Sequence, residues 1–102
     1  MLNITINEQE KGLLVTLVGD FDNVSSAQAV VSLEPIFEHT DCNVIFDCRE
    51  LSYISSSGLR IMLNVYKHIH GNGHYVILKG MTNDIKDVFL LGGFLQLFIT
   101  ED

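Results

Sequence analysis

Hydrophobic and polar residues alternate at the start of the chain and then give way to apolar runs. In residues 2–8 the apolar positions are Leu2, Ile4 and Ile6, and this period of two predicts a half-exposed edge strand. Residues 13–18 are almost all apolar, which is typical of a strand covered on both faces. Only a short polar turn separates the two runs, so we expect an antiparallel hairpin.

A first helix is predicted from Ser25, which forms a capping-box pattern with Gln28 three residues later. Pro35 is expected to end or kink this helix near Glu34, because proline cannot continue a helix without breaking its hydrogen bonds. We expect the apolar residues of this stretch to form its buried face: Ala27, Val30 and Val31.

A third strand is predicted over 43–48, ending near Asp47 and followed by a short polar connection. The second helix is predicted over about 56–70 and ends at the glycine-rich run 71–73. Its apolar residues follow the i, i+3, i+4, i+7 spacing of a helix face: Leu59, Met62, Leu63 and Tyr66.

The remaining segments complete an alternating order of strands and helices. Residues 75–78 are predicted as a buried strand, Asn83 as the cap of a short helix that ends at 92–93, and residues 95–99 as a final strand. The order β-β-α-β-α-β-α-β predicts an α/β fold, with a mixed, mostly parallel sheet and helices packed on it. With 102 residues, the chain is expected to form a single domain over 1–102.

The charge and composition of the chain indicate what kind of partner it binds and in which cellular compartment we expect it. The net charge is −7, from 6 Lys and Arg against 13 Asp and Glu. This disfavours binding to nucleic acids and adhesion to anionic membranes, so a basic protein surface is the expected partner. No segment approaches the ~20 apolar residues of a membrane span, and the N-terminus lacks the pattern of a signal peptide, so we expect no membrane insertion and a cytoplasmic protein.

The two cysteines, Cys42 and Cys48, flank one predicted strand. Six extended residues span ~20 Å, whereas a disulfide needs Cα atoms within about 7 Å. We therefore expect two thiols rather than a disulfide between them.

Polar side chains follow two predicted strands. Asp20 and Asp22 follow the second strand, and the segment from Asp47 to Ser57 follows the third. If the two strands are parallel, both segments lie at the same edge of the sheet, where ligand-binding groups of α/β folds collect. This convergence predicts a functional site at that edge.

Three serines, Ser55, Ser56 and Ser57, open the second predicted helix. The first backbone N–H groups of a helix have no intrahelical partner and lie at the positive end of its dipole, which suits a phosphate group. One serine is therefore a candidate for phosphorylation. A serine at this place is also a common N-cap, but capping accounts for only one of the three.

A nucleophilic serine would need a nearby base, usually histidine. Three of the four histidines are predicted about 15–20 Å away, at the far end of the second helix, and the Gly-x-Ser-x-Gly elbow is absent. We therefore expect no catalytic residues and no enzyme activity. The histidines are His39, His68, His70 and His74.

The carboxylates Asp20, Asp22 and Asp47 are of the kind that binds Mg²⁺, and Asp47 occupies a place where receiver domains carry a phosphorylated aspartate. A receiver usually has a lysine near its last strand, however, and residues 87–102 contain no Lys or Arg. His70 and His74 are separated by a helix-breaking segment. We expect no metal or cofactor, and we expect Asp22 to shape the loop beside Ser56.

Two local motifs resemble a known family. An apolar strand with Asp47, the pair Leu51-Ser52, two bulky residues and then Ser-Ser-Gly-Leu resembles the signature of STAS domains, above all that of small bacterial anti-sigma factor antagonists. The segment 19–22, Gly-Asp-Phe-Asp, fits the motif that follows the second strand of the family. The likeness covers nearly the whole chain and implies a STAS-like fold.

The resemblance implies a phosphorylation-controlled binding module. The unmodified protein would bind an anti-sigma factor that is also a serine kinase and thereby free a sigma factor. That kinase would then phosphorylate the domain and release it, and a serine phosphatase would reset it. The resemblance also implies that the domain is a ligand and substrate; we expect it to be a monomer.

The register of the motif places Ser56 at the phospho-acceptor position, with Ser57 as the rival, and Ser55 where the family usually has Asp. This departure favours the alternative function, a STAS-type scaffold that docks constitutively in a larger complex, such as one associated with a transporter. The residues expected to bind the partner are Asp20, Asp22, Asp47, Ser55, Ser56, Ser57 and Gly58.

Overall fold

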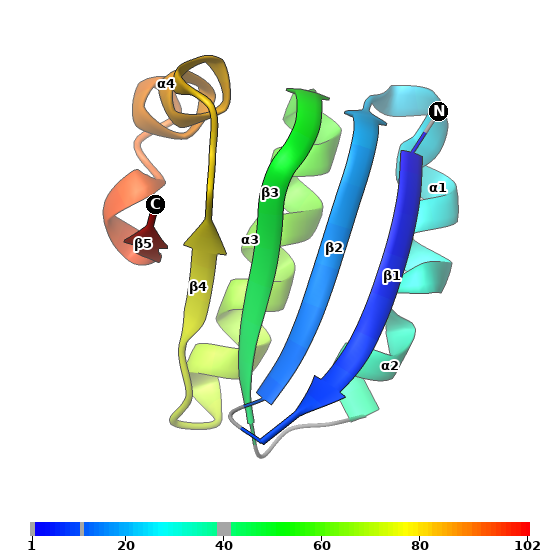
Figure 1. Cartoon of the computed structure of the whole chain (residues 1–102), viewed down its shortest axis with the longest axis vertical. Helices are drawn as coiled ribbons and strands as arrows, with labels where there is room; N and C mark the ends of the chain where they lie inside the picture. The colour runs from blue at the N-terminus through cyan, green and yellow to red at the C-terminus, as the bar shows by residue number, and fades with distance from the viewer. Residues whose placement is uncertain (1, 11, 39–41) are drawn as a thin grey trace.

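The strands form one sheet whose order follows the chain (Figure 1). The computed structural model describes residues 2–10, 12–38 and 42–102, so that His39 lies outside the described residues. Within them the order is β1-β2-β3-β4-β5; β1 and β2 are antiparallel and the other neighbours are parallel. The predicted mixed sheet and its hairpin are confirmed. The strands are β1 (Leu2–Gln9), β2 (Gly12–Phe21), β3 (Asn43–Ile54), β4 (Val76–Lys79) and β5 (Ile99–Glu101).

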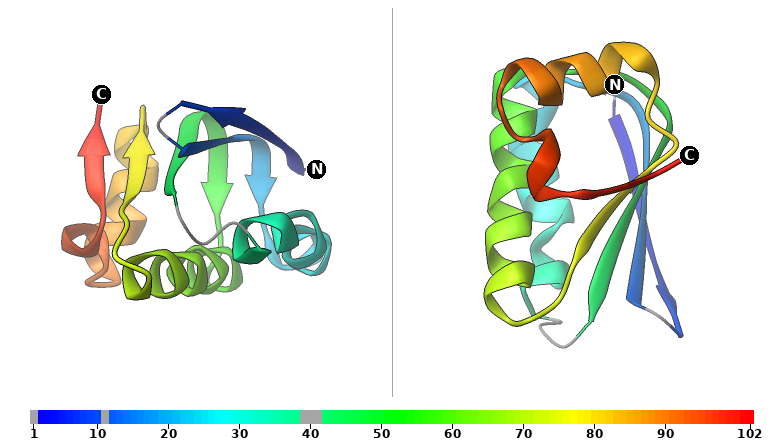
Figure 2. Two further views of the ribbon diagram at one scale, coloured as in Figure 1. Left: turned by 90° about the horizontal axis from the view of Figure 1, so that it is seen from below. Right: turned by 90° about the vertical axis from the view of Figure 1, so that its left-hand side faces the viewer.

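The helices lie on one side of this sheet, and α4 passes across the edge formed by the carboxyl ends of the parallel strands (Figure 2). They are α1 (Asn23–Ser32), α2 (Glu34–Glu38), α3 (Ser56–Gly71), α4 (Asn83–Leu91) and the 3₁₀ turn η1 (Leu95–Leu97). Among the described residues, no helix has the length and apolar character that crossing a bilayer requires.

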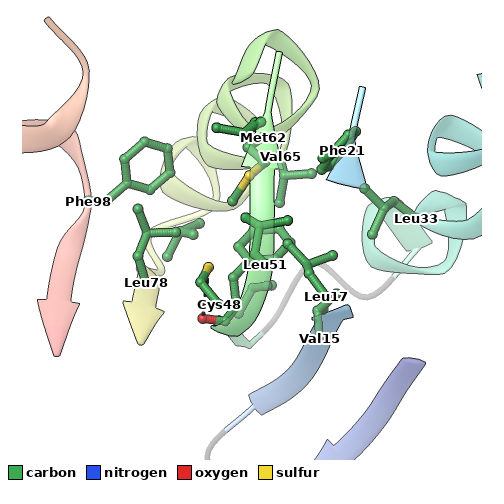
Figure 3. Close-up of a cluster of buried hydrophobic side chains, with 14 of the residues drawn as sticks. Val15, Leu17, Phe21, Leu33, Cys48, Leu51, Met62, Val65, Leu78 and Phe98 are labelled. Carbon is green, nitrogen blue, oxygen red and sulfur yellow. Dashed lines mark hydrogen bonds between the residues drawn. The ribbon is translucent and has the colours of Figure 1, made fainter. Parts of the chain in front are cut away.

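The core lies between the sheet and the helices (Figure 3). Leu13, Val15 and Leu17 of β2 are buried there, while the residues between them are only half-buried. The prediction that 13–18 is covered on both faces is therefore wrong, because the helices cover only the face to which the odd-numbered residues point. Cys48 is buried in this core, and burial raises the pKa of its thiol to about 12; both cysteines are thiols, as expected.

Strand β3 is longer than the predicted 43–48 and continues to Ile54. Its second half pairs with β2, with two irregularities in register that accommodate extra residues on β3. Polar residues such as Arg49 and Ser52 are exposed there, whereas Leu51 and Ile54 are buried. A sheet that helices cover on one face only tolerates polar residues on its other face. Because residues 49–53 are mostly polar, the sequence suggests a loop after the third strand instead of its continuation. Asp47 consequently lies in the middle of β3.

Helix α1 buries the face opposite to the predicted one. Its buried residues are Ser25, Ser26 and Ala29, whereas Val30 and Val31 are 51% and 64% exposed. Small residues let the helix lie close to the sheet, and the buried serine hydroxyls find hydrogen-bond partners in the turn before it. Because these partners satisfy the polar side chains, burying them carries little cost.

The first helix breaks near Glu34, as predicted, because α1 ends at Ser32 and α2 begins at Glu34. Pro35 is the second residue of α2, a position that suits the fixed φ of proline. Two other local expectations are wrong. Thr82, not Asn83, caps α4. Most of the predicted strand 95–99 is the turn η1, and β5 begins only at Ile99.

Candidate functional site

The ends of β2 and β3 lie side by side and lead directly into α1 and α3. Phe21 pairs with Ile54, and the backbone N–H of Ser55 donates to the carbonyl oxygen of Phe21 at 2.8 Å. The two helices therefore begin next to each other at the edge of the sheet. This confirms the predicted convergence for the segments around Asp22 and Ser55–Ser57.

Ser55 is the N-cap of α3. Its side chain is buried, and its Oγ accepts a hydrogen bond from the backbone N–H of Gly58 at 3.2 Å. Aspartate and serine are both preferred N-caps, because each offers a side-chain oxygen to the first turn. The serine at this position thus caps α3, as an aspartate could.

Gly58 is buried where the first turn of α3 meets β2. A Cβ atom at this position would lie 2.7 Å from Cδ1 of Phe21 and 3.0 Å from the carbonyl oxygen of Phe21. Phe21 is itself fully buried, so its ring has no free space to move into. Gly58 is thus required by packing.

The next two serines differ in their environment. Ser56 is the first residue of α3 and its side chain is exposed. Ser57 is half-buried, and its Oγ donates a hydrogen bond to Oδ1 of Asn23 at the start of α1. The hydroxyl of Ser56 faces solvent, whereas that of Ser57 links the two helices.

Asp22 is the N-cap of α1. Its Oδ1 accepts from the N–H of Ser25 at 2.9 Å, and its own N–H donates to the Oγ of Ser25 at 3.0 Å, which completes a capping box. The predicted box from Ser25 to Gln28 is therefore wrong by three residues. The hydrogen bonds from Ser25 hold the pKa of the Asp22 carboxyl below its ordinary value. Asp20 is half-buried, and its carbonyl oxygen accepts from Ser25 Oγ at 3.0 Å.

Asp47 does not join this site. It pairs in register with Thr16, five positions before the Phe21–Ile54 pair on β2, which corresponds to about 17 Å along the strand. Its carboxylate accepts from Nε and an Nη atom of Arg49 at 3.0 and 2.7 Å, and this ion pair holds the pKa of Asp47 below its ordinary value. The prediction that Asp47 lies beside the serines failed because β3 continues to Ile54.

An apolar hollow of about 280 Å³ lies beside Ser56. It is lined by Ser56, Leu59, Arg60, Leu63, Gly92 and Phe94. Sequence reasoning missed it, because one wall comes from α3 and the other from the turn after α4, some thirty residues later. Leu63, predicted to be inward, is half-buried at this wall.

The described histidines lie away from the serines. His68 packs against Phe37 with ring centroids 4.9 Å apart, and His70 stacks on Tyr66 at 5.1 Å, both near the end of α3. Among residues 2–10, 12–38 and 42–102, no three His, Cys, Asp or Glu side chains group as metal ligands would. The site therefore consists of the exposed hydroxyl of Ser56 beside the apolar hollow.

Residues 3–102 match the family model of the STAS domain. The chain belongs to the STAS domain family. Its sequence is 27% identical over 97 residues to BtrV of Bordetella bronchiseptica, a protein named as an anti-sigma factor antagonist; the match covers 95% of this chain and 84% of BtrV.

Solved structures show the same fold. An anti-sigma factor antagonist from Mycobacterium paratuberculosis superposes with a TM-score of 0.84 at 15% identity, covering 99% of this chain and 86% of that one. The antagonist SpoIIAA in its unphosphorylated form gives 0.76 at 17% identity, covering 98% and 88%. The phosphorylated SpoIIAA of Bacillus gives 0.73 at 16% identity, covering 96% and 90%. The predicted STAS-like fold is confirmed.

Proposed function

We propose that this STAS domain is an anti-sigma factor antagonist controlled by phosphorylation of Ser56. In its unmodified form it binds an anti-sigma factor that is also a serine kinase, and this frees a sigma factor. The kinase, with its own ATP and Mg²⁺, phosphorylates Ser56 and releases the domain, and a serine phosphatase restores it. The domain is then a cytoplasmic, monomeric ligand and substrate with no catalytic role.

The observation that carries the proposal is the difference among the three serines. Ser55 is buried as the cap of α3, and Ser57 donates to Asn23, whereas the hydroxyl of Ser56 is exposed. A kinase needs an accessible hydroxyl, and the positive end of the helix dipole at the start of α3 favours the product phosphate. The names of the relatives support the same function, and SpoIIAA has been solved with and without phosphate.

The position of Ser56 explains how a phosphate would control binding. A phosphoserine adds about −1.5 to −2 charges at pH 7. Ser56 lines the apolar hollow, which suits an apolar side chain of the partner, so the phosphate would have to be desolvated when the partner docks. Within the free domain the phosphate remains solvated at the helix N-terminus. The modification therefore weakens binding while leaving the fold intact.

The cap of α3 supports the switch over a constitutive scaffold. That alternative depended on the serine at position 55, where the family usually has aspartate. Since Ser55 caps α3 as an aspartate would, the replacement does not by itself mark a site that has lost its switch.

Phosphorylation by the serine-kinase anti-sigma factors of the cell of origin tests the proposal. Each purified kinase is incubated with the domain, ATP and Mg²⁺, and the phosphate is mapped by mass spectrometry. We expect phosphate on Ser56, lost in Ser56→Ala and retained in the matched control Ser57→Ala. Modification of Ser57 alone, or of no serine by any of these kinases, would contradict the proposal.

A further inference from the structure

The outer face of α1 is apolar and exposed to solvent. Val24 is 89% exposed, Val31 64% and Val30 51%, and Ala27 is exposed as well. Val24, Ala27 and Val31 are spaced three and four residues apart, so they lie on one side of the helix. Val24, Ala27 and Val31 form a stripe, here termed the α1 stripe, along the length of α1.

The absence of charge on this helix is unusual for this chain. An exposed helix face normally carries charged residues, and 19% of the whole chain is charged. The ten residues of α1, Asn23–Ser32, include no Asp, Glu, Lys or Arg. Depletion of charge is a mark of the centre of a protein–protein interface rather than of a free surface.

Acidic residues lie at both ends of the stripe. Asp20 and Asp22 precede α1, and the exposed Glu34 and Glu38 belong to the short helix that follows it. An apolar surface with acidic ends is complementary to an apolar surface with basic ends. The same acidic ends oppose adsorption to an anionic membrane.

The stripe begins near the phosphorylation site. Its first residue, Val24, follows Asn23, whose side chain accepts the hydrogen bond from Ser57. Val24 itself lines a hollow with Leu2 of β1, whereas Ser56 lines the hollow formed by Leu59, Leu63 and Phe94. A partner that reaches from one hollow to the other spans the start of α3, where Ser56 and Ser57 lie.

We propose that the α1 stripe is a second docking surface for the anti-sigma factor kinase, which contributes an apolar patch flanked by basic side chains. This inference rests on the proposed function and identifies the part of the molecule, besides the serine region, that the partner holds. If the kinase covers both the α1 stripe and the hollow beside Ser56, a phosphate on Ser56 lies inside the interface rather than at its border, and it therefore weakens binding more strongly.

Titration calorimetry with the kinase that phosphorylates Ser56 in the assay above tests this inference. The key variant is Val24→Gln/Val31→Gln, which replaces two exposed apolar side chains by polar ones. Glutamine has a higher helix propensity than valine, so the melting temperature should stay the same or rise slightly. We expect the Kd for the kinase to rise about tenfold or more, as for residues near the centre of an interface.

Tyr75→Gln is the matched control. Tyr75 is an exposed apolar residue, 55% accessible, and it precedes β4 at the opposite end of the parallel strands from Ser56. Its replacement should leave the Kd unchanged. An equal rise in Kd for Tyr75→Gln and the double variant would point to general loss of apolar surface and would overturn the inference.

The remaining outcomes separate the two proposals. If the wild type binds the kinase and the double variant binds equally well, the docking role of the α1 stripe is wrong while the proposed function stands. If the wild type binds none of the kinases, the proposed function fails and the inference fails with it. Binding of the wild type to phosphatidylcholine–phosphatidylglycerol vesicles, lost in the double variant, would assign the stripe to a membrane instead.

Discussion

Helices α1 and α3 lie side by side on the same face of the sheet and begin at the same edge. The sequence nevertheless predicted the buried side of α3 largely correctly and that of α1 wrongly. In α3 Leu59 and Met62 are buried as predicted, together with Val65 and Ile69. The predicted Leu63 and Tyr66 are half-buried at the border of this face. In α1 the valines Val24, Val30 and Val31 are all exposed, so the side that apolar periodicity predicted as buried is the wrong one. The buried side is instead the one whose serines have hydrogen-bond partners in the preceding turn.

The difference teaches that an apolar helix face is not necessarily a core face. Helix α3 has one apolar side and uses it for the core, leaving Ser56 exposed at its first residue. Helix α1 carries apolar side chains on its outer side as well, and these face solvent. In the function proposed above, α1 supplies contact surface and α3 supplies the switch.

The largest effect is expected for Gly58→Ala, which disturbs the seating of α3 on β2. The added Cβ would clash with the buried ring and the carbonyl of Phe21, so the free energy of unfolding should fall by about 1–3 kcal/mol. Gly71→Ala in the same helix is the control, because a Cβ there contacts nothing within 4 Å. Urea denaturation of both variants measures the difference, and equal stabilities would contradict the packing role of Gly58.

Removal of the cap of α3 should cost less. In Ser55→Ala the N–H of Gly58 loses its acceptor, and we expect the unfolding free energy to fall by ~1 kcal/mol. Ser55→Asp restores a capping oxygen and should be about as stable as the wild type. Thermal melts of both variants check this, and a strongly destabilised Asp variant would show that the two residues are not equivalent at this position.

Substitutions of Ser56 should separate binding from stability. Ser56 is not the cap, so Ser56→Ala should fold and bind the kinase like the wild type, while Ser56→Asp should gain about 0.3–1 kcal/mol of stability from the helix dipole. The Asp variant should nevertheless bind more weakly, though less so than the phosphorylated protein, because it carries one charge and fewer acceptor oxygens. Melts paired with calorimetry measure both properties. Equal affinities of the two variants, with intact folds, would refute the switch and favour a constitutive scaffold.

The smallest effect concerns the cap of α1 and its dependence on pH. Since the pKa of Asp22 is lowered by folding, its carboxylate stabilises the protein above the ordinary pKa of 3.8, and this contribution disappears as the pH falls through the lower, folded-state value. Asp22→Asn keeps a capping oxygen but does not titrate. The stability difference between wild type and Asp22→Asn should therefore shrink on acidification below pH 4, as measured by melts at a series of pH values. A difference that stays constant with pH would mean that the carboxylate charge contributes nothing.

The sequence alone determined the order of the elements, the hairpin, the extent of α3 and the place of the serines at its start. These features depend on short-range signals, such as strand alternation, helical spacing and the glycines after α3, which act within a few residues of one another. The family motifs at 19–22 and 51–59 added the fold, and the match over residues 3–102 confirms it.

The tertiary structure decided the features that depend on contacts between distant segments. The length of β3 is set by its pairing with β2, which moved Asp47 away from the serines. The hollow beside Ser56 exists only because residues 92–94 pack next to the start of α3. The buried face of α1 was chosen by the fit of small, hydrogen-bonded side chains against the sheet. The hydrophobic pattern shows which residues of one segment are apolar. Which of them are buried depends on the surfaces of other segments that pack against them.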